Sequence, residues 1–439
     1  MEINNFIKKI KKKLRSEGKE TSLFWFLRIA RFFKKVETKI NSEFDYQLNF
    51  IQKVIKATGP RLAGSTEEKR GAQIIAEEFS KVVGRPAAIE TFRCYPKSSM
   101  AAIPILSYFM LFLLIPLYIF LPLAGLIVMI WLLLFFFVQI IHYWGFFDFL
   151  FAAKKSQNVY SIIEPLSNKK DFTLILGSHI DSAWSWGRLF HGSKYIIFRV
   201  LTIIIAIIGF LFFSVFRVGF IDIREVVFSW TTLISVLFIP GFYYASQIIN
   251  LNKGGASPGA GDNLSGVSVG LWLIKYYQTH PEKYPKNCRI VLAAFGAEEL
   301  GLKGSKDFVQ KHKNDLLEGS VWLLNIDGPG LSKNFYIAEQ EVALGVKHNS
   351  DFCRLAHQSL EELGIKSQFY KIPVGGTDAA PFSQAGIRAI TLTNQGVDLS
   401  GQYHTALDDI DRLNLGVVKK MNEVCVKLIK KIDEFVHQA

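Results

Sequence analysis

Short apolar runs recur along the chain, and stretches with helical periodicity separate them. Six of these runs have the length of single strands, and they cover residues 88–92, 158–163, 172–176, 289–295, 320–324 and 389–393. Apolar runs of this length are typical of strands that are buried on both faces of a parallel sheet. The pattern therefore predicts an α/β domain whose central sheet is mostly parallel and is flanked by helices.

Two other apolar stretches are too long to belong to a soluble domain. Residues 98–147 contain no Lys, Arg, Asp or Glu, and residues 195–252 contain two apolar runs on either side of a polar break. The charged residues of this break are Arg217, Asp222, Arg224 and Glu225. A membrane-spanning helix needs about 20 apolar residues. We therefore predict four transmembrane helices, arranged as hairpin 1 (residues 98–147) and hairpin 2 (residues 195–252).

Both hairpins interrupt one domain rather than separate several. Hairpin 1 falls between the strand candidates 88–92 and 158–163, and hairpin 2 falls between 172–176 and 289–295. A segment with an even number of spans returns to the side of the membrane from which it left. We therefore expect residues 46–97, 148–194 and 253–439 to fold together as one domain at the membrane surface.

The first 45 residues are predicted to form a basic amphipathic segment on the membrane surface. Residues 1–40 carry twelve Lys and Arg against four Glu, in a chain of 439 residues whose formal net charge is +13. Bulky apolar residues recur among these charges at helical spacing. A basic arm can bind nucleic acid, but basic amphipathic helices with aromatic residues suit anionic lipids better. We expect anionic lipid as the partner, no nucleic acid, and no cleavable signal peptide.

Four polar motifs follow strand candidates, and together with a fifth motif they contain a complete set of metal ligands. The five motifs are GSHID (177–181), DNLSG (262–266), EELGL (298–302), NID (325–327) and YHT (403–405). Ligands bind beyond the carboxyl ends of the strands in an open α/β sheet, so the motifs are expected to meet at one site. Each motif alone would be an ordinary turn or helix cap. Their combination predicts a metal-dependent hydrolase, because zinc prefers imidazole and carboxylate ligands.

The motifs and their order resemble those of the aminopeptidase Y family of zinc exopeptidases, which also includes glutamate carboxypeptidases and glutaminyl cyclases. Residues 59–65 (GPRLAGS) are similar to the N-terminal signature of this family, and residues 375–387 are similar to its late loop. The resemblance covers roughly residues 50–97, 156–187 and 256–435. The chain departs from the family at Ala379, where a His commonly stands. The resemblance implies a zinc exopeptidase-like fold into which the two hairpins are inserted.

The resemblance also implies a set of ligands for two zinc ions. One ion would bind His179, Asp327 and Asp262, and the other would bind Glu299, His404 and the same Asp262 as a bridge. Two ions about 3.5–4 Å apart activate a water molecule and polarise the substrate carbonyl. The peptide bond after the bridging Asp is often cis in this family, so the bond between residues 262 and 263 is a candidate for this geometry.

Two further acidic residues are implied to take part in catalysis. Glu298 would take a proton from the metal-bound water and pass it to the leaving amine. Asp181 would orient the ring of His179, since metal-bound imidazoles usually donate their second N–H group to a carboxylate. Asp408 is a candidate for the same role near His404.

The function that these residues predict best is that of a membrane-embedded two-zinc metallopeptidase. It would act as an aminopeptidase or another exopeptidase on a peptide or protein substrate. Two alternatives remain open, namely a glutaminyl-peptide cyclase with one zinc ion and an inactive membrane scaffold of the same fold. Substrate pockets lie on loops, and the motifs do not distinguish the amino from the carboxyl end of a peptide.

Charge next to the apolar stretches predicts their orientation, because Lys and Arg are kept in the cytoplasm. Basic residues gather on the domain side of the hairpins, at Lys97, Lys154, Lys155, Arg188, Lys194, Arg199 and Lys253. We predict a multi-pass protein of a bacterial-type plasma membrane, with both termini and the site on the cytoplasmic side. The four cysteines lie far apart in the sequence, so we expect small buried residues rather than disulfides.

Overall fold

The structure is a computed structural model that describes residues 46–167, 169–187, 195–220, 230–252, 255–396 and 401–438. Residues 1–50 and 51–439 form two separate units. The predicted basic segment, residues 1–45, lies outside the described residues.

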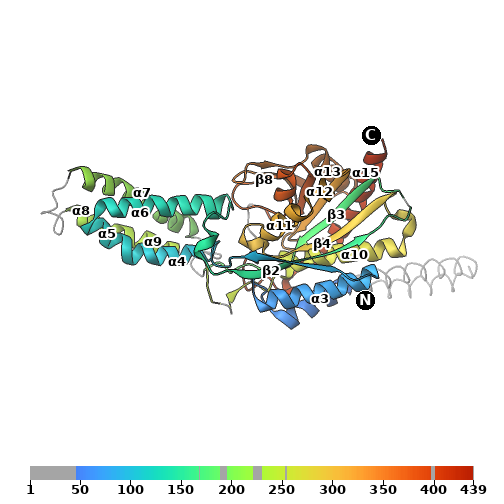
Figure 1. Ribbon diagram of the computed structural model, residues 1–439, viewed down its shortest axis with the longest axis horizontal. Coiled ribbons are helices and arrows are strands. Elements are labelled where there is room, and N and C mark those ends of the chain that lie inside the picture. The colour runs from blue at the N-terminus through green and yellow to red at the C-terminus, as the bar shows by residue number, and fades with distance from the viewer. Residues whose placement is uncertain are drawn as a thin grey trace, which may run out of the picture. The chain divides into compact units, whose positions relative to one another are not determined.

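A nine-stranded sheet forms the centre of the α/β region (Figure 1). Its strands are β1 (Ala88–Cys94), β2 (Lys154–Ile163), β3 (Phe172–His179), β4 (Cys288–Phe295), β5 (Ser320–Asp327), β6 (Phe335–Glu341), β7 (Val346–Lys347), β8 (Ser367–Ile372) and β9 (Arg388–Thr393). The strand order is β1-β2-β4-β3-β5-β9-β6-β7, and β8 pairs with β6. The six strands that the apolar runs predict are all present. Three of them, β3, β4 and β5, are almost entirely buried, as continuous apolar runs require.

The prediction that the sheet is mostly parallel is wrong, because the sheet is mixed. Pairings β3–β4, β3–β5, β5–β9 and β6–β8 are parallel, whereas β1–β2, β2–β4, β6–β7 and β6–β9 are antiparallel. Apolar runs report burial and not strand direction, so they could not reveal this. Hairpin 1 leaves after β1 and returns before β2, and these two strands pair antiparallel, with Cys94 opposite Lys154.

Helices cover both faces of the sheet. They include α3 (Thr66–Val83), α10 (Ser265–Thr279), α11 (Lys303–Lys311), α12 (Lys313–Leu317), α13 (Ser350–Glu362), α14 (Ala379–Gln384) and α15 (Leu415–Gln438). Helices α11, α12 and α14 pack on one face in an apolar cluster that includes Phe295, Phe308 and Phe382. Helix α10 packs on the opposite face, where a Cβ atom added at Gly270 would lie 2.6 Å from the side chain of Leu292. The core therefore lies in two layers, one on each side of the sheet.

Hairpin 1 forms two apolar helical segments, as predicted. The first runs over α4 (Ala102–Phe109), η1 (Met110–Leu114) and α5 (Ile115–Phe120), and the second over α6 (Pro122–Phe135) and η2 (Phe136–Ile141). Both segments are long and apolar enough to cross a membrane. They meet in a tight turn at Leu121, where a Cβ atom on Gly125 would lie 3.1 Å from the backbone nitrogen of Tyr118.

Hairpin 2 differs from its prediction. Helix α7 (Ile196–Phe220) contains a third segment long enough to span a membrane, but the described residues contain three such segments and not four. After residues 221–229, which are not described, the chain forms α8 (Trp230–Ile234), η5 (Ser235–Phe238) and α9 (Ile239–Ser246). The uncharged run predicted a span to residue 252, but its last residues leave the helix and Ile249 pairs with Trp186 of the α/β region. The absence of charge does not show where a helix ends.

Aromatic side chains fill the interior of the helical bundle. Tyr118 packs against Phe210 and Phe238, with both pairs of ring centroids 5.5 Å apart. Arg217, which the sequence places in a polar break, lies instead in the last turn of α7 and is buried. Its guanidinium group donates to the hydroxyl groups of Thr231 and Thr232 and to one backbone carbonyl. Both hairpins are therefore linked through one charged side chain.

Candidate metal centre

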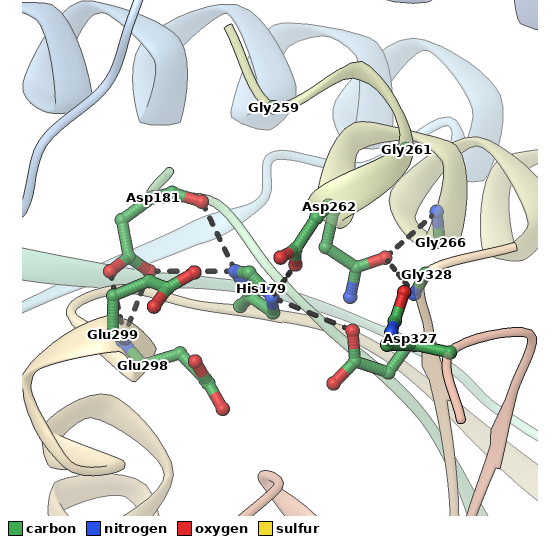
Figure 2. Close-up of polar contacts among 12 residues, drawn as sticks. His179, Asp181, Gly259, Gly261, Asp262, Gly266, Glu298, Glu299, Asp327 and Gly328 are labelled. Carbon is green, nitrogen blue, oxygen red and sulfur yellow. Dashed lines mark hydrogen bonds and ion pairs between the residues drawn. The ribbon is translucent and has the colours of Figure 1, made fainter. Parts of the chain in front are cut away.

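The strand ends bring together the five motifs that the sequence identifies. His179 is the last residue of β3, and Asp327 is the last residue of its neighbour β5. Glu298 and Glu299 form the turn η9 (Glu298–Leu300) directly after β4, the other neighbour of β3. Asp262 lies in η7 (Ala260–Leu264), which opens α10. Figure 2 shows His179 with Asp262 and Asp327 on one side of its ring and Asp181 on the other.

The two imidazole rings each face two carboxylates. The Nε2 atom of His179 lies 3.0 Å from Oδ1 of Asp262 and 3.7 Å from Oδ1 of Asp327. The Nε2 atom of His404 lies 3.4 Å from Oδ2 of Asp262 and 3.2 Å from Oε1 of Glu299. Ligands at 2.0–2.2 Å from a tetrahedral zinc ion are about 3.3–3.6 Å apart. The four distances scatter around this range, and each oxygen of Asp262 faces a different imidazole.

Asp181 contacts both the ring of His179 and the turn that follows β4. The Nδ1 atom of His179 lies 3.1 Å from the backbone carbonyl oxygen of Asp181, and 3.7 Å from its carboxylate. That carboxylate instead accepts hydrogen bonds from the backbone N–H groups of Glu298 and Glu299, at 3.0 and 3.1 Å. The main chain of Asp181 therefore contacts the ring of His179, and its side chain holds the turn η9 (Glu298–Leu300), called the glutamate turn below.

Asp408 also acts on a backbone and not on a ring. Its carboxylate accepts hydrogen bonds from the N–H groups of Gly261 and Asp262, at 2.6 and 3.0 Å. Burial raises the pKa of Asp408 to about 7, and the nearby charge of Asp262 contributes to this rise. The peptide bond between Asp262 and Asn263 is cis, as the resemblance implies. Asp408 thus holds the segment that presents the bridging candidate.

The Asn263 side chain connects this segment to the end of β5. Its Oδ1 atom accepts hydrogen bonds from the N–H groups of Gly266 and Gly328, and its Nδ2 atom donates to the carbonyl of Ile326. A side chain on Gly266 would collide with Asn263, since an added Cβ would lie 2.3 Å from Oδ1. The small residue at this position therefore allows the close approach of α10 to β5.

Two buried charged residues near the site are positions that the sequence motifs did not identify as functional. Arg61 donates hydrogen bonds to four backbone carbonyl groups, those of Gly59, Ile180, Pro258 and Gly259. Burial lowers the pKa of Arg61 to about 10. Glu68 accepts hydrogen bonds from the N–H groups of Gly64 and Ala297 and from the hydroxyl group of Ser156. Burial raises the pKa of Glu68 to about 8.

A local signal could have identified Glu68. Ser65 caps α3 by accepting a hydrogen bond from the N–H group of Glu68, and Glu68 reaches back to Gly64. Ser-x-x-Glu before a helix is the signature of a capping box. The contact of Glu68 with Ala297, which precedes the glutamate turn, could not be read from this signature because it joins residues far apart in the sequence.

The cluster has more carboxylates than imidazoles, and this imbalance changes its proton affinity. Burial disfavours the charged form of His404, but Glu299 and Asp262 outweigh it and raise the pKa of His404 to about 10. The pKa of His179 is raised well above its ordinary value in the same way, with Glu298 as the largest contributor among its neighbours. Burial raises the pKa of Glu298 well above its usual range. The site therefore attracts cations, either protons or metal ions.

Aromatic rings enclose His404 and connect it to hairpin 2. The ring of Trp186 stacks on His404 with centroids 5.7 Å apart, and the ring of Tyr403 stacks on it at 3.8 Å. The N–H group of Trp186 donates to the carbonyl of His404. Gly187 and Asn250 continue this contact, because the N–H group of Gly187 bonds to Ile248 and that of Asn250 bonds to Ser185. The end of hairpin 2 therefore lies against the segment that packs on His404.

The fold and the site are of the kind found in metal-dependent hydrolases, since a mixed α/β sheet presents imidazoles and carboxylates at its strand ends. Residues 247–429 match the model of peptidase family M28. Aminopeptidase YwaD of Bacillus subtilis is 31% identical over 163 residues, which cover 36% of this chain and 34% of that protein. A probable zinc metalloprotease of Pyrenophora teres is 34% identical over 97 residues, covering 22% of this chain and 20% of that protein. The chain thus spans about a third or less of the length of these relatives.

Solved structures share the fold over most of the chain. A zinc aminopeptidase from Bacillus subtilis, BSAP, superposes with a TM-score of 0.51 at 14% identity, covering 89% of this chain and 95% of that one. An aminopeptidase from Aneurinibacillus reaches a TM-score of 0.52 at 14% identity, covering 88% and 93%. A glutaminyl cyclase from an Acidobacteriales bacterium reaches 0.51 at 12% identity, covering 89% and 95%. The match to peptidase family M28 over residues 247–429 agrees with the resemblance of this chain to the aminopeptidase Y-like zinc peptidases.

Proposed function

We propose that the protein is a two-zinc exopeptidase held at a membrane surface by its helical hairpins, with an aminopeptidase activity as the first candidate. One observation carries the number of ions: the two carboxylate oxygens of Asp262 face different imidazoles, at 3.0 Å from His179 and 3.4 Å from His404. A single-ion site would need only one of these two arrangements. Relatives that are described as a zinc metalloprotease and an aminopeptidase support the choice of zinc and of peptide substrates.

The residues divide into ligands and a base. His179, Asp327 and Asp262 would hold one ion, and Glu299, His404 and Asp262 would hold the other. When bound, the ions would polarise a peptide carbonyl and lower the pKa of a water molecule. Glu298 would accept the proton of that water and transfer it to the leaving amine.

Metal analysis of two variants tests the bridge. Asp262→Ala should lose both ions, because both depend on this residue, whereas His404→Ala should mainly weaken the binding of one. Mass spectrometry of native protein in detergent micelles gives the number of ions for each variant. Two ions retained by Asp262→Ala would contradict the proposed bridge.

Digestion of a peptide library distinguishes the possible activities. An aminopeptidase shortens peptides from the amino end, and a carboxypeptidase shortens them from the carboxyl end. A glutaminyl cyclase leaves the chain length unchanged and removes ammonia from peptides that begin with Gln. The cyclase is a second candidate because glutaminyl cyclases occur among the proteins of similar fold. An inactive scaffold would leave the library unchanged even when loaded with zinc, and that result would overturn the proposal.

The helical bundle supports a membrane location. Three segments, Ala102–Phe120, Pro122–Ile141 and Ile196–Gly219, are long and apolar enough to cross a membrane. Large aromatic residues lie exposed where hairpin 1 ends, with Trp144 72% and Phe149 71% exposed. Aromatic residues of this kind concentrate at the boundary between lipid and water. We propose that these residues mark the membrane surface and that residues 46–97, 148–194 and 253–439 form one domain beside it.

We also propose that this domain faces the cytoplasm and that residues 1–45 contact anionic lipids. Lys97, Lys154 and Lys155 are exposed on the domain side, while Arg188, Lys194 and Lys253 lie outside the described residues. The four native cysteines are free and buried, as predicted. They should therefore react slowly with thiol reagents. Gly401→Cys would add one exposed thiol, since nothing lies within 4 Å of its Cβ position. Labelling of intact cells by an impermeant reagent before lysis would reverse the proposed orientation.

A further inference from the structure

The root of hairpin 1 is joined to the glutamate turn by a buried cluster of polar contacts. Asp148 lies just after the hairpin, in η3 (Asp148–Leu150), and its Oδ1 atom accepts hydrogen bonds from Ser98 and Gln139, at 2.8 and 2.6 Å. Its Oδ2 atom lies 2.6 Å from Nζ of Lys303, in an ion pair whose two side chains are about 15% exposed. Lys303 opens α11 and follows the turn closely. Both ends of the hairpin are therefore fixed to the α/β region.

A second contact reaches a candidate metal ligand directly. The hydroxyl group of Ser99 donates to the backbone carbonyl of Glu299 at 3.3 Å. The Lys306 ammonium donates to the carbonyl of Gly301, at 3.1 Å, and to that of Tyr143, at 2.6 Å. The position of the hairpin root is thereby set relative to the residues of the site.

These contacts place Tyr143, the second residue after η2, against the glutamate turn. Its backbone has a φ angle of +56°, a left-handed conformation that is uncommon for a tyrosine. Its ring lies on Gly301, where an added Cβ atom would be 2.9 Å from the ring atom Cγ. The ring also packs with an apolar cluster of Leu302, Val346 and Ala380. The left-handed backbone of Tyr143 and the absence of a side chain at Gly301 together allow the Tyr143 ring to pack on this turn.

The hydroxyl group of Tyr143 points toward the late loop (residues 375–387). It would be 3.9 Å from a Cβ atom added at Gly375, in the late loop that the family resemblance identifies. Among the described residues, none forms a hydrogen bond with this hydroxyl. Burial raises the pKa of Tyr143 well above its usual value, and the charges of Glu298, Glu299 and Glu341 raise it further. The group therefore remains a protonated phenol and can donate a hydrogen bond.

We propose that Tyr143 is a substrate-binding residue that hairpin 1 supplies to the active site. Its ring forms a wall between the glutamate turn and the late loop, and its hydroxyl group donates a hydrogen bond to a carbonyl of the bound peptide. A neutral carbonyl is the preferred acceptor, because the negative charges of Glu298, Glu299 and Glu341 act on this hydroxyl and disfavour a further negative charge. This inference rests on the proposed peptidase function. It assigns to the membrane hairpin a part in substrate binding in addition to anchoring.

Substitution of Tyr143 by Phe isolates the hydroxyl group. Tyr143→Phe keeps the ring contacts with Gly301 and loses no hydrogen bond within the described protein, so zinc content and thermal stability should not change. A hydrogen bond contributes about 0.5–1.5 kcal/mol, so binding of the peptide should weaken about two- to tenfold. Tyr143→Ala removes the wall as well, and it should change which side chains the site prefers.

Tyr118→Phe is the matched control. It removes a hydroxyl group from the same hairpin, but this hydroxyl bonds to the backbone of Thr231 inside the bundle. Tyr118→Phe should therefore lower thermal stability and leave peptide binding and kcat/KM unchanged. The two variants thus have opposite expected effects on stability and on binding.

Peptide binding can be measured without turnover. Zinc-loaded Glu298→Gln protein in detergent micelles is mixed with a tetrapeptide library, and the retained peptides are quantified by mass spectrometry with and without Tyr143→Phe. A two- to tenfold loss of retained peptide supports the proposal, even if the protein with Glu298 restored hydrolyses nothing. Equal retention with and without Tyr143→Phe overturns it, even if the wild-type protein is an active peptidase. A parent protein that retains no peptide overturns both the inference and the proposed function.

Discussion

Among the described residues, the α/β region and the helical bundle each bury one arginine, and the partners of the two arginines differ. Arg61 of the α/β region donates to four backbone carbonyls, two of which belong to the loop just before Asp262. Arg217 of the bundle donates to two threonine hydroxyls and one carbonyl, and its guanidinium lies 5.0 Å from the ring centroid of Tyr118. Arg61 organises the loops of a site, whereas Arg217 connects two hairpins.

The two regions also differ in where their apolar and polar residues lie. In the bundle, apolar residues such as Phe112, Phe212 and Leu233 are between 63% and 78% exposed, while its interior holds polar groups of Ser214, Arg217 and Thr231. In the α/β region strands β3, β4 and β5 are mostly apolar, and polar residues of the candidate site lie at their ends. The arrangement of the bundle supports its proposed membrane location, because lipid would remove the penalty for apolar surface but would offer no hydrogen bonds to polar groups. Buried polar residues are therefore part of the candidate site in the α/β region, whereas in the bundle they connect helices.

The largest expected effect belongs to the α/β region. Glu298→Gln should lower kcat by about 10²–10⁴-fold, because it removes the proposed general base. The fold and the metal content should not change, since the Glu298 side chain is not a proposed ligand. Peptide hydrolysis and metal content are measured on the same preparation, with Gln→Glu reversion as the control. Hydrolysis at close to the wild-type rate would remove Glu298 from the mechanism.

The affinity for zinc should increase strongly with pH. The pKa of His404 is raised to about 10 in the metal-free site, so this group carries a proton at neutral pH that the metal must displace. Fewer protons are bound to the site at higher pH, so a metal ion has to displace fewer of them when it binds. Affinity should rise roughly tenfold per pH unit for each proton released, between pH 6 and 8. Competition with a chelating dye, corrected for the protonation of the dye, measures this, and an affinity independent of pH would be contrary to it.

The two buried arginines offer the sharpest test of the comparison. Arg61→Met should lower the free energy of unfolding by at least about 3 kcal/mol, because several buried carbonyls lose their donors. It should also weaken zinc binding, since two of those carbonyls belong to the segment before Asp262. Arg217→Met should lower the stability of the bundle without changing the metal content.

Thermal unfolding in detergent and metal analysis of both variants check this difference. Loss of zinc from Arg217→Met would show that the bundle and the metal centre depend on one another more closely than their separate contacts indicate. Unchanged zinc affinity in Arg61→Met would contradict the role of Arg61 at the site.

The smallest expected effect concerns packing within the bundle. A Cβ atom at Gly241 of α9 would lie 2.3 Å from the Cβ atom of Ala206 and 2.7 Å from the carbonyl oxygen of Thr202 in α7. Gly241→Ala should therefore cost about 1–3 kcal/mol of bundle stability through overpacking. Gly219→Ala is the control, because nothing lies within 4 Å of its Cβ position in α7. Equal melting temperatures for the two variants would contradict the close packing of these helices.

The order of the strands and the direction of the outer ones depended on tertiary structure. Apolar runs predict β3, β4 and β5 correctly because these strands are buried on both faces, and burial is what an apolar run records. The antiparallel pairs formed by β1, β2, β6 and β7 carry no such signal. Likewise, the uncharged run of hairpin 2 does not show that Ile249 leaves the bundle to pair with Trp186.

The sequence by itself pointed to the residues of the candidate site and predicted most of the long apolar helices. The motifs and the family resemblance that they carry point to His179, Asp262, Glu299, Asp327 and His404, and all of these except Asp262 lie beyond a predicted strand. The lengths of the apolar stretches were enough to predict hairpin 1, since crossing a lipid bilayer depends on length and composition. Local patterns are sufficient where the physical requirement is itself local.

Only the tertiary structure decided what each supporting residue contacts. Asp181 bonds to the glutamate turn, Asp408 bonds to the backbone of Asp262, and Tyr143 lies against Gly301. Tyr143 and Gly301 are more than 150 residues apart in the chain, and hairpin 1 had to pack on the glutamate turn before they could meet. No periodicity or motif encodes such a contact, because its free energy depends on two surfaces that form only when the whole domain has folded.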